Sequence, residues 1–95
     1  MANLHLLRSS GFTHMKLQQC QTALLEDDLV LLIDDGVYNL KHPIVEQLAS
    51  KHQVYALTDH VSARGIVAPL PNVTLCDYEQ FVSLTLAADK VITWQ

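Results

Sequence analysis

The sequence is poor in glycine and in positive charge, and both shortages exclude classes of function. Only three of its 95 residues are glycine, and it contains no glycine-rich phosphate loop, no GxGxxG turn and no GxSxG nucleophile turn. Six lysine and arginine residues stand against ten aspartate and glutamate residues, which gives a net charge of −4. The six are scattered, whereas nucleic-acid backbones are bound by clustered lysine and arginine. We therefore expect no nucleotide cradle and no direct contact with nucleic acid.

Cysteine, long apolar runs and metal-binding patterns are also scarce. Two cysteines, Cys20 and Cys76, are too few for a disulfide framework. The apolar run Leu29–Ile33 is far shorter than the roughly 20 residues that span a bilayer, and the first residues lack the pattern of a signal peptide. The five histidines show no metal-ligand spacing. We expect a cytoplasmic, reduced protein with no membrane segment, no metal and no resident cofactor.

Apolar side chains, by contrast, are abundant. Hydrophobic residues make up 49% of the chain and charged residues only 17%, below the usual charged fraction of about 25%. A length of 95 residues fits a single domain over 1–95, and a domain of this size hides only about 60–65% of the surface of its unfolded chain. The excess indicates a parallel sheet that is covered on both faces, together with an exposed apolar patch for a partner.

Strand patterns alternate with helical patterns along the chain. This order predicts an α/β fold, a three-layer α/β/α sandwich around a mostly parallel five-stranded sheet. The predicted strands are Asn3–Leu7, Leu29–Ile33, Gln53–Leu57, Val73–Cys76 and Lys90–Thr93. The predicted helices are His14–Leu25, one that begins at Pro43, a short one capped by Asp59 that stops at Gly65, and one that follows a capping box of Asp77 and Gln80.

Two local expectations concern the surroundings of these elements. We expect the last helix to bury four side chains: Tyr78, Phe81, Val82 and Thr85. We expect the acidic pair Asp34 and Asp35 to lie in a loop at the end of the second strand, where Gly36 supplies a special backbone angle.

Four short segments and a terminal tryptophan occur in a characteristic order. They are Leu4-His5-Leu6-Leu7-Arg8-Ser9, Asp35-Gly36-Val37-Tyr38, Val54-Tyr55-Ala56-Leu57 running to Ala63-Arg64-Gly65, Asp77-Tyr78-Glu79-Gln80-Phe81-Val82-Ser83-Leu84-Thr85, and finally Trp94. Each segment is common by itself, but in this order and spacing they resemble the TusB/DsrH family over nearly the whole chain. That family supplies the small subunit of a three-component sulfur-relay complex. The resemblance also implies the α/β/α fold, with a flavodoxin-like character.

The resemblance further implies a partner set and a role. The expected assembly is a heterohexamer that contains two copies of this chain, of a TusC/DsrF-like subunit and of a TusD/DsrE-like subunit. In that family the obligate sulfur-carrying cysteine lies on the TusD/DsrE-like subunit, so this chain would be an accessory docking subunit of a sulfurtransferase. In the TusB branch the complex delivers persulfide sulfur towards 2-thiolation of the tRNA wobble uridine, and in the DsrH branch it serves intracellular sulfur oxidation. The sequence leaves both branches open.

Cys20 is the candidate residue for chemistry, because some family members, chiefly of the DsrH kind, carry a cysteine at this offset before the Asp-Gly pair. As a thiolate it would accept a sulfane sulfur and hold it as a transient persulfide. However, Cys20 shares an apolar stripe with Leu17 and Leu24, where a cysteine packs as a small hydrophobe. Both roles stay open.

Cys76 is expected in the core, and Arg64 either holds a carboxylate of a neighbouring subunit or complements a helix dipole.

Overall fold

One parallel sheet organises the chain. The computed structural model describes residues 2–12, 15–66 and 72–94, and within these ranges the strands are β1 (Leu4–Leu7), β2 (Leu29–Leu32), β3 (Val54–Leu57), β4 (Val73–Cys76) and β5 (Val91–Trp94). Their order in the sheet is β4-β3-β2-β1-β5, and every neighbouring pair is parallel. The chain therefore steps outward from β1 to β4 and then returns to add β5 on the other side of β1.

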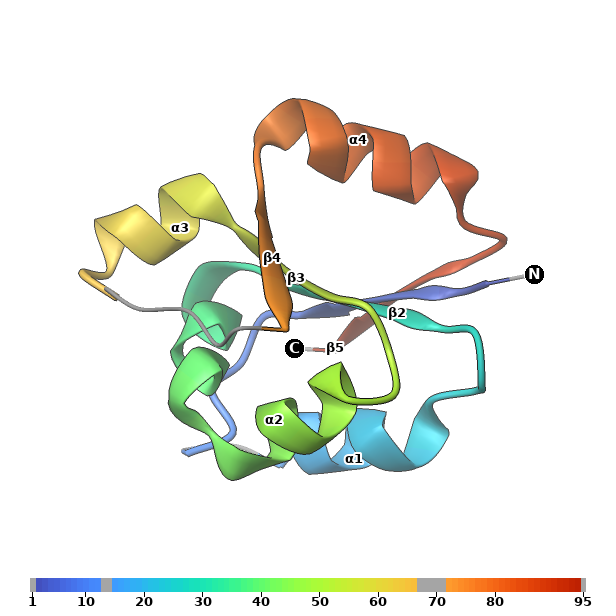
Figure 1. The fold of residues 1–95 in the computed structure, drawn as a ribbon, viewed down its shortest axis with the longest axis horizontal. Helices are drawn as coiled ribbons and strands as arrows, with labels where there is room; N and C mark the ends of the chain where they lie inside the picture. Colours follow the sequence, from blue (N-terminus) through green and yellow to red (C-terminus); the bar gives the residue numbers. More distant parts are fainter. Residues whose placement is uncertain (1, 13–14, 67–71, 95) are drawn as a thin grey trace.

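Helices cover both faces of this sheet (Figure 1). Helices α1 (Lys16–Ala23) and α2 (Pro43–Ala49) lie on one face, and α4 (Tyr78–Ala87) crosses the other. The helix α3 (Thr58–Ala63) and the 3₁₀ helix η1 (Asp34–Lys41) follow β3 and β2 directly. The predicted three-layer fold is confirmed, and the strand predictions are correct to within about one residue at each end. The predicted start of the first helix at His14 lies outside the described residues.

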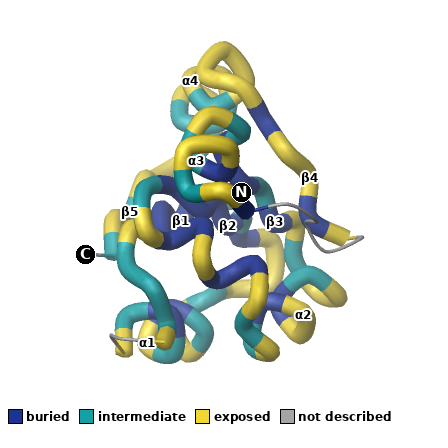
Figure 2. The backbone as a smooth tube through the Cα atoms, turned by 90° about the vertical axis from the view of Figure 1, so that its left-hand side faces the viewer, coloured by how far each residue is buried: buried dark blue, intermediate teal, exposed yellow. Residues whose placement is uncertain are grey.

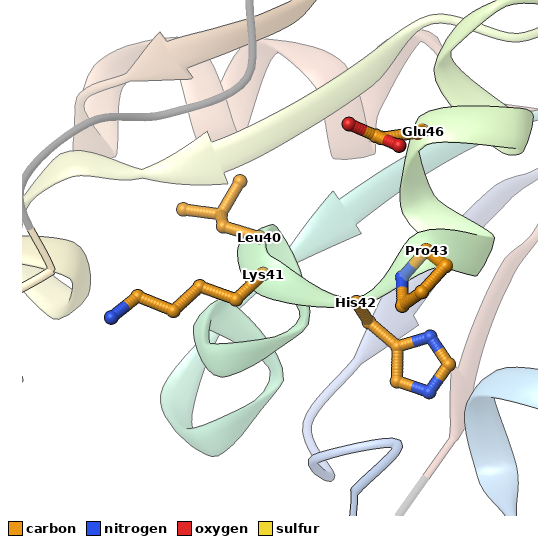
Figure 3. A pocket seen from close by; sticks show the side chains of 5 residues that line it. All are labelled: Leu40, Lys41, His42, Pro43 and Glu46. Carbon is orange, nitrogen blue, oxygen red and sulfur yellow. The ribbon is translucent and has the colours of Figure 1, made fainter.

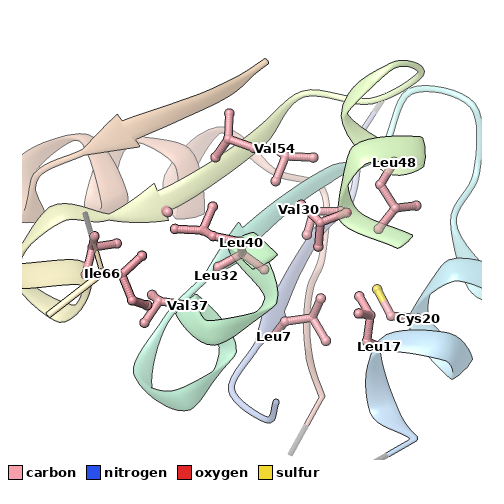
Figure 4. Packing of buried hydrophobic residues seen from close by; sticks show 14 residues of the cluster. Leu7, Leu17, Cys20, Val30, Leu32, Val37, Leu40, Leu48, Val54 and Ile66 are labelled. Carbon is pink, nitrogen blue, oxygen red and sulfur yellow. The ribbon is translucent and has the colours of Figure 1, made fainter. Parts of the chain in front are cut away.

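The core is divided by the sheet into two unequal parts. The larger part fills the space under α1 and α2 and includes Leu7, Leu17, Cys20, Val30 and Leu32 (Figure 4). The smaller part lies on the α4 side and consists of Leu4, Leu6, Leu31, Ile33, Leu57 and Cys76. Because consecutive strand residues point to opposite faces, the continuous apolar runs of β1 and β2 supply both parts. This is the sequence pattern of strands that are covered on both sides.

Gly36 is required for close packing and not for an unusual backbone angle. A Cβ built on it would lie 1.9 Å from the backbone carbonyl oxygen of Leu7, because η1 begins directly against the end of β1. The expected loop is instead the first turn of η1, and the left-handed angle belongs to Asp34, with φ of 50°. The prediction for this segment is therefore wrong in both respects.

The C-terminal end of α3 and the start of α4 agree with the predicted local signals. Gly65 has φ of 66°, and the N–H groups of Gly65 and Ile66 donate to the carbonyls of Ser62 and Val61 at 3.1 and 3.2 Å. This is the glycine-terminated cap that the sequence predicted. Asp77 and Gln80 form the predicted capping box. Asp59, in contrast, does not cap α3, since it is the second residue of a helix that begins at Thr58.

The burial predicted for α4 is wrong. Tyr78 and Val82 are exposed, while Phe81 and Thr85 are only partly buried. In the described part of the chain, α4 contributes no fully buried side chain, although it is the principal cover of its face of the sheet.

Candidate functional site

Segments that are distant in the sequence meet at the carboxyl edge of the sheet. Arg8, just after β1, donates from Nε to Oδ2 of Asp34 at 2.7 Å. Arg64, just after α3, donates from Nε to Oδ1 of Asp35 at 3.1 Å. The backbone N–H of Arg8 also donates to the carbonyl of Trp94 at 3.1 Å. This edge is the one where open α/β sheets carry their functional groups.

His60 of α3 connects the start of α4 to the same edge of the sheet. The backbone N–H of Asp34 donates to Nδ1 of His60 at 2.8 Å, so Nδ1 carries no hydrogen and the ring proton lies on Nε2. From there His60 donates to the hydroxyl oxygen of Tyr78 across 3.1 Å. The left-handed backbone of Asp34 is therefore held by a side chain from α3, which is itself held by the start of α4.

The two ion pairs line a shallow hollow of about 260 Å³, together with Ser9. Two guanidinium groups and two carboxylates face it, so its charges balance. Net positive charge favours the binding of a phosphate, and the charged groups that line this hollow carry none. Arg64, for which two roles were open, is used inside its own chain. The edge is a cross-linked, neutral surface, which suits contact with a protein better than capture of an anion.

A second polar cluster is buried beneath α1. Asp28 receives hydrogen bonds from the backbone N–H of Asn3 (3.1 Å), from the backbone N–H of Leu25 (3.1 Å) and from Nε2 of His5 (2.8 Å). On the other side of the ring, the indole N–H of Trp94 donates to Nδ1 of His5 at 3.0 Å. Since an indole nitrogen only donates, Nδ1 carries no hydrogen, and Nε2 is the nitrogen that donates to Asp28. A relay of polar contacts thus joins the loop before β2 to β1 and β5.

The Asp28 carboxylate is stable in this buried place because of its donors. Burial by itself raises the pKa of the carboxyl, but hydrogen bonds from Leu25, His5 and Asn3 outweigh it, and the pKa of Asp28 lies below its ordinary value. The backbone carbonyl of Asp28 also accepts from Nδ1 of His52 at 3.0 Å. Asp28 is therefore the point where three loops at the amino edge of the sheet are joined.

Cys20 is completely buried. Its side chain lies on the inner face of α1 near Leu17 and Leu48, as Figure 4 shows. Burial, with a smaller contribution from the negative charge of Asp28, raises the pKa of the Cys20 thiol to about 12. At neutral pH the thiol then stays protonated, whereas the thiolate is the form that reacts with sulfane sulfur. In this conformation the Cys20 side chain packs within the larger part of the core.

Cys76 is buried like Cys20, and its surroundings disfavour the thiolate. Burial, with the charge of Asp77 adding to it, raises the pKa of the Cys76 thiol, and its side chain lies in the smaller part of the core. Within residues 2–12, 15–66 and 72–94, no three His, Cys, Asp or Glu side chains are grouped to hold a metal ion. Over the same ranges, none of the helices has both the length and the apolar character that a membrane crossing needs.

A further small hollow of about 120 Å³ lies where η1 turns into α2 (Figure 3). His42 and Pro43 form one wall, and Leu40, Lys41 and Glu46 complete it. His42 is engaged by the fold, because its Nδ1 accepts from the backbone N–H of Ile44 at 3.2 Å and its ring packs on Phe12 at 4.8 Å between centroids. The ring that forms one wall of this hollow is therefore part of the N-terminal cap of α2.

The sequence identified some of these residues and missed others. His5, which belongs to the family-like segment Leu4-His5-Leu6-Leu7-Arg8-Ser9, is buried, and both of its ring nitrogens are hydrogen-bonded. Asp28 was missed. It follows Glu26 and Asp27 in an acidic run, and no periodic pattern in the sequence indicates which of these three acidic residues is buried. Asn39 was also missed, although its buried amide accepts from the Gly11 N–H at 2.6 Å and donates to the Ser9 carbonyl at 3.0 Å.

Known proteins resemble this chain in both sequence and fold. A family model described as "DsrH like protein" matches residues 9–91. Protein TusB of Pectobacterium parmentieri is 33% identical over 98 residues, which cover 96% of this chain and 99% of that protein. Protein TusB of Yersinia pestis (strain Pestoides F) is 36% identical over 75 residues, which cover 76% of this chain and 79% of that protein. The crystal structure of the ychN protein from E. coli superposes with a TM-score of 0.75 over 98% of this chain and 99% of that one. At 18% identity, the likeness to ychN concerns the fold alone.

Proposed function

This chain belongs to the TusB/DsrH family, and from that membership we propose that it is the small docking subunit of a sulfur-relay complex. The proposed assembly is a cytoplasmic heterohexamer, which contains two copies each of this chain, a TusC/DsrF-like subunit and a TusD/DsrE-like subunit. The relatives at 33% and 36% identity that bear the name TusB support the branch in which sulfur passes towards 2-thiolation of the tRNA wobble uridine.

The state of Cys20 is the observation that carries the docking role. A sulfur carrier needs a thiolate that a donor protein can reach, whereas Cys20 is fully buried and its pKa is raised to about 12. The persulfide therefore travels on a partner subunit, and this chain shapes the complex around it. The net charge of −4 also supports a docking role. A negatively charged subunit repels the tRNA backbone, so another component of the pathway must contact the tRNA.

A second candidate function is a sulfur-accepting role for Cys20 in a DsrH-like complex for intracellular sulfur oxidation. It is favoured by Cys20, which stands at the offset before the Asp-Gly pair where some family members, chiefly of the DsrH kind, carry a cysteine. For this role α1 must move away from the sheet, since Cys20 lies on its inner face. The two functions differ in whether sulfur is ever found on this chain.

Intact-mass spectrometry of the three-subunit complex after exposure to a persulfide donor separates them. We expect the TusD/DsrE-like subunit to gain the mass of one sulfur atom and this chain to gain none, because its Cys20 thiol is protonated and enclosed. The same experiment with Cys20→Ala should give an unchanged loading pattern.

Cys76→Ala is the matched control, since Cys76 is the other buried cysteine. A sulfur adduct on the wild-type chain that disappears in Cys20→Ala and persists in Cys76→Ala would contradict the docking role and support the alternative.

A further inference from the structure

Helix α4 is apolar over a wider arc than the side that faces the core. On its inner side, Phe81 and Leu84 pack against the smaller part of the core. Beside them Tyr78, Val82 and Leu86 follow one another at intervals of four residues, so they form a single stripe about 12 Å long. We refer to these three residues as the outer stripe. Their exposed fractions are 49%, 53% and 81%.

This apolar arc is wider than the part that the chain's own core covers. A surface helix normally buries its apolar stripe and turns its polar residues, here Glu79, Gln80 and Ser83, towards water. In the described part of the chain the outer stripe is exposed, and its Tyr78 end contacts His60 of α3. Figure 1 shows α4 as the outermost element on its face of the sheet, and Figure 2 shows exposed and half-buried segments along it. Single exposed leucines are ordinary, but three large apolar side chains in one row mark an interaction surface.

The charges around the outer stripe indicate the chemistry of its partner. The exposed residues Asp77, Glu79 and Asp89 lie along α4 and just beyond its ends, against a single exposed lysine, Lys90. A second copy of this chain would bring the same acidic excess to the contact, and like charges in apposition disfavour association. A partner with lysine or arginine around an apolar centre would instead be attracted.

We propose that the outer stripe docks an apolar face of another subunit of the relay complex, and that this face is rimmed by basic residues. The inference rests on the proposed function, because it takes the occupant to be the TusC/DsrF-like or the TusD/DsrE-like subunit. Docking there completes the cover of α4 and hence of its face of the sheet. It also explains why a helix that lies over the smaller part of the core has no fully buried residue in the isolated chain.

The double variant Val82→Gln/Leu86→Gln tests this surface. Both side chains point away from the core, so the melting temperature should stay close to that of the wild type. The dissociation constant for the TusC/DsrF-like and TusD/DsrE-like subunits, measured by calorimetry with purified proteins, should rise by about 30-fold for the partner that covers the stripe. Leu25→Gln is the matched control, since Leu25 is a leucine with 63% exposure in the loop between α1 and β2, and it should leave binding unchanged.

Glu79→Gln tests the charge part of the proposal. It should weaken the same binding about threefold at low salt, and the difference should shrink as salt is added, because exposed charges are screened. Equal binding by the double variant and the wild type would overturn this inference while leaving the docking role intact. Loss of self-association in the double variant, with partner binding unchanged, would also overturn it. If the wild type binds neither subunit, the proposed function itself fails, and the inference fails with it.

Discussion

Gly36→Ala is expected to be the most damaging single substitution in this chain. The added methyl carbon would lie 1.9 Å from the carbonyl oxygen of Leu7, and that oxygen already accepts the N–H of Ile33 at 3.0 Å. Neither atom can move without separating β1 from the start of η1. We expect a loss of at least about 4 kcal/mol in the free energy of unfolding, out of the roughly 5–15 kcal/mol that a domain of this size possesses. Urea denaturation followed by circular dichroism measures the loss.

Gly65→Ala provides the comparison that separates crowding from backbone preference. Gly65 has φ of 66°, yet nothing lies within 4 Å of a Cβ built on it. Gly65→Ala should therefore lower the free energy of unfolding only by the cost of a left-handed alanine, about 1–2 kcal/mol. If Gly36→Ala were no worse than Gly65→Ala, the close approach of η1 to β1 would be refuted.

Asp28→Ala is expected to cause the second largest loss of stability. Removal of the carboxylate leaves three donors without partners: the backbone N–H groups of Asn3 and Leu25, and Nε2 of His5. A buried donor that loses its partner costs about 1–3 kcal/mol. The His5 donor is buried and the two backbone donors are partly buried, so we expect a total loss of at least about 3 kcal/mol and a fall in melting temperature of about 15 °C or more. Asp27→Ala is the matched control, because Asp27 is exposed in the same acidic run and its loss should change the melting temperature very little.

The contribution of Asp28 should also be visible in the pH dependence of stability. Its pKa in the folded protein lies below the ordinary value, so the folded state favours the charged carboxylate. The contribution is then complete above the unfolded pKa of about 3.9 and is lost as the pH falls through the lower folded value. Between neutral pH and about pH 5 the difference between wild type and Asp28→Ala should be constant, and it should shrink below about pH 4. A difference that stays the same down to pH 2 would show that the carboxylate is not the stabilising group.

The architecture of the chain is largely predictable because its signals are local. The apolar runs of β1 to β4, the glycine that ends α3 and the capping box of α4 each depend on a few neighbouring residues, and all of them appear at the predicted places. The prediction failed where the reason for a residue lies far away in the sequence. Glycine is needed at position 36 because the carbonyl of Leu7 lies against it. The neighbouring sequence suggested instead a left-handed backbone angle at Gly36, and it is Asp34 that adopts this angle.

The candidate site was less predictable for the same reason. The motif residues were recognised, but their pairing was not, because the contacts Arg8–Asp34, Arg64–Asp35 and Asp34–His60 each join residues more than 25 positions apart. The burial of α4 was overestimated because a helical apolar pattern was taken to face this chain's own core. In the structure half of that pattern faces outward, and a periodic signal by itself does not say whether the surface that covers it belongs to the same chain.

The native mass of the complex tests the central claim most directly. The chain should be co-expressed with the TusC/DsrF-like and TusD/DsrE-like subunits of the same organism, purified through a tag on one partner, and measured by native mass spectrometry. The account predicts a particle that contains two copies of each of the three subunits. A chain that stays apart from both partners, as a stable monomer or as an assembly of its own copies, would contradict it.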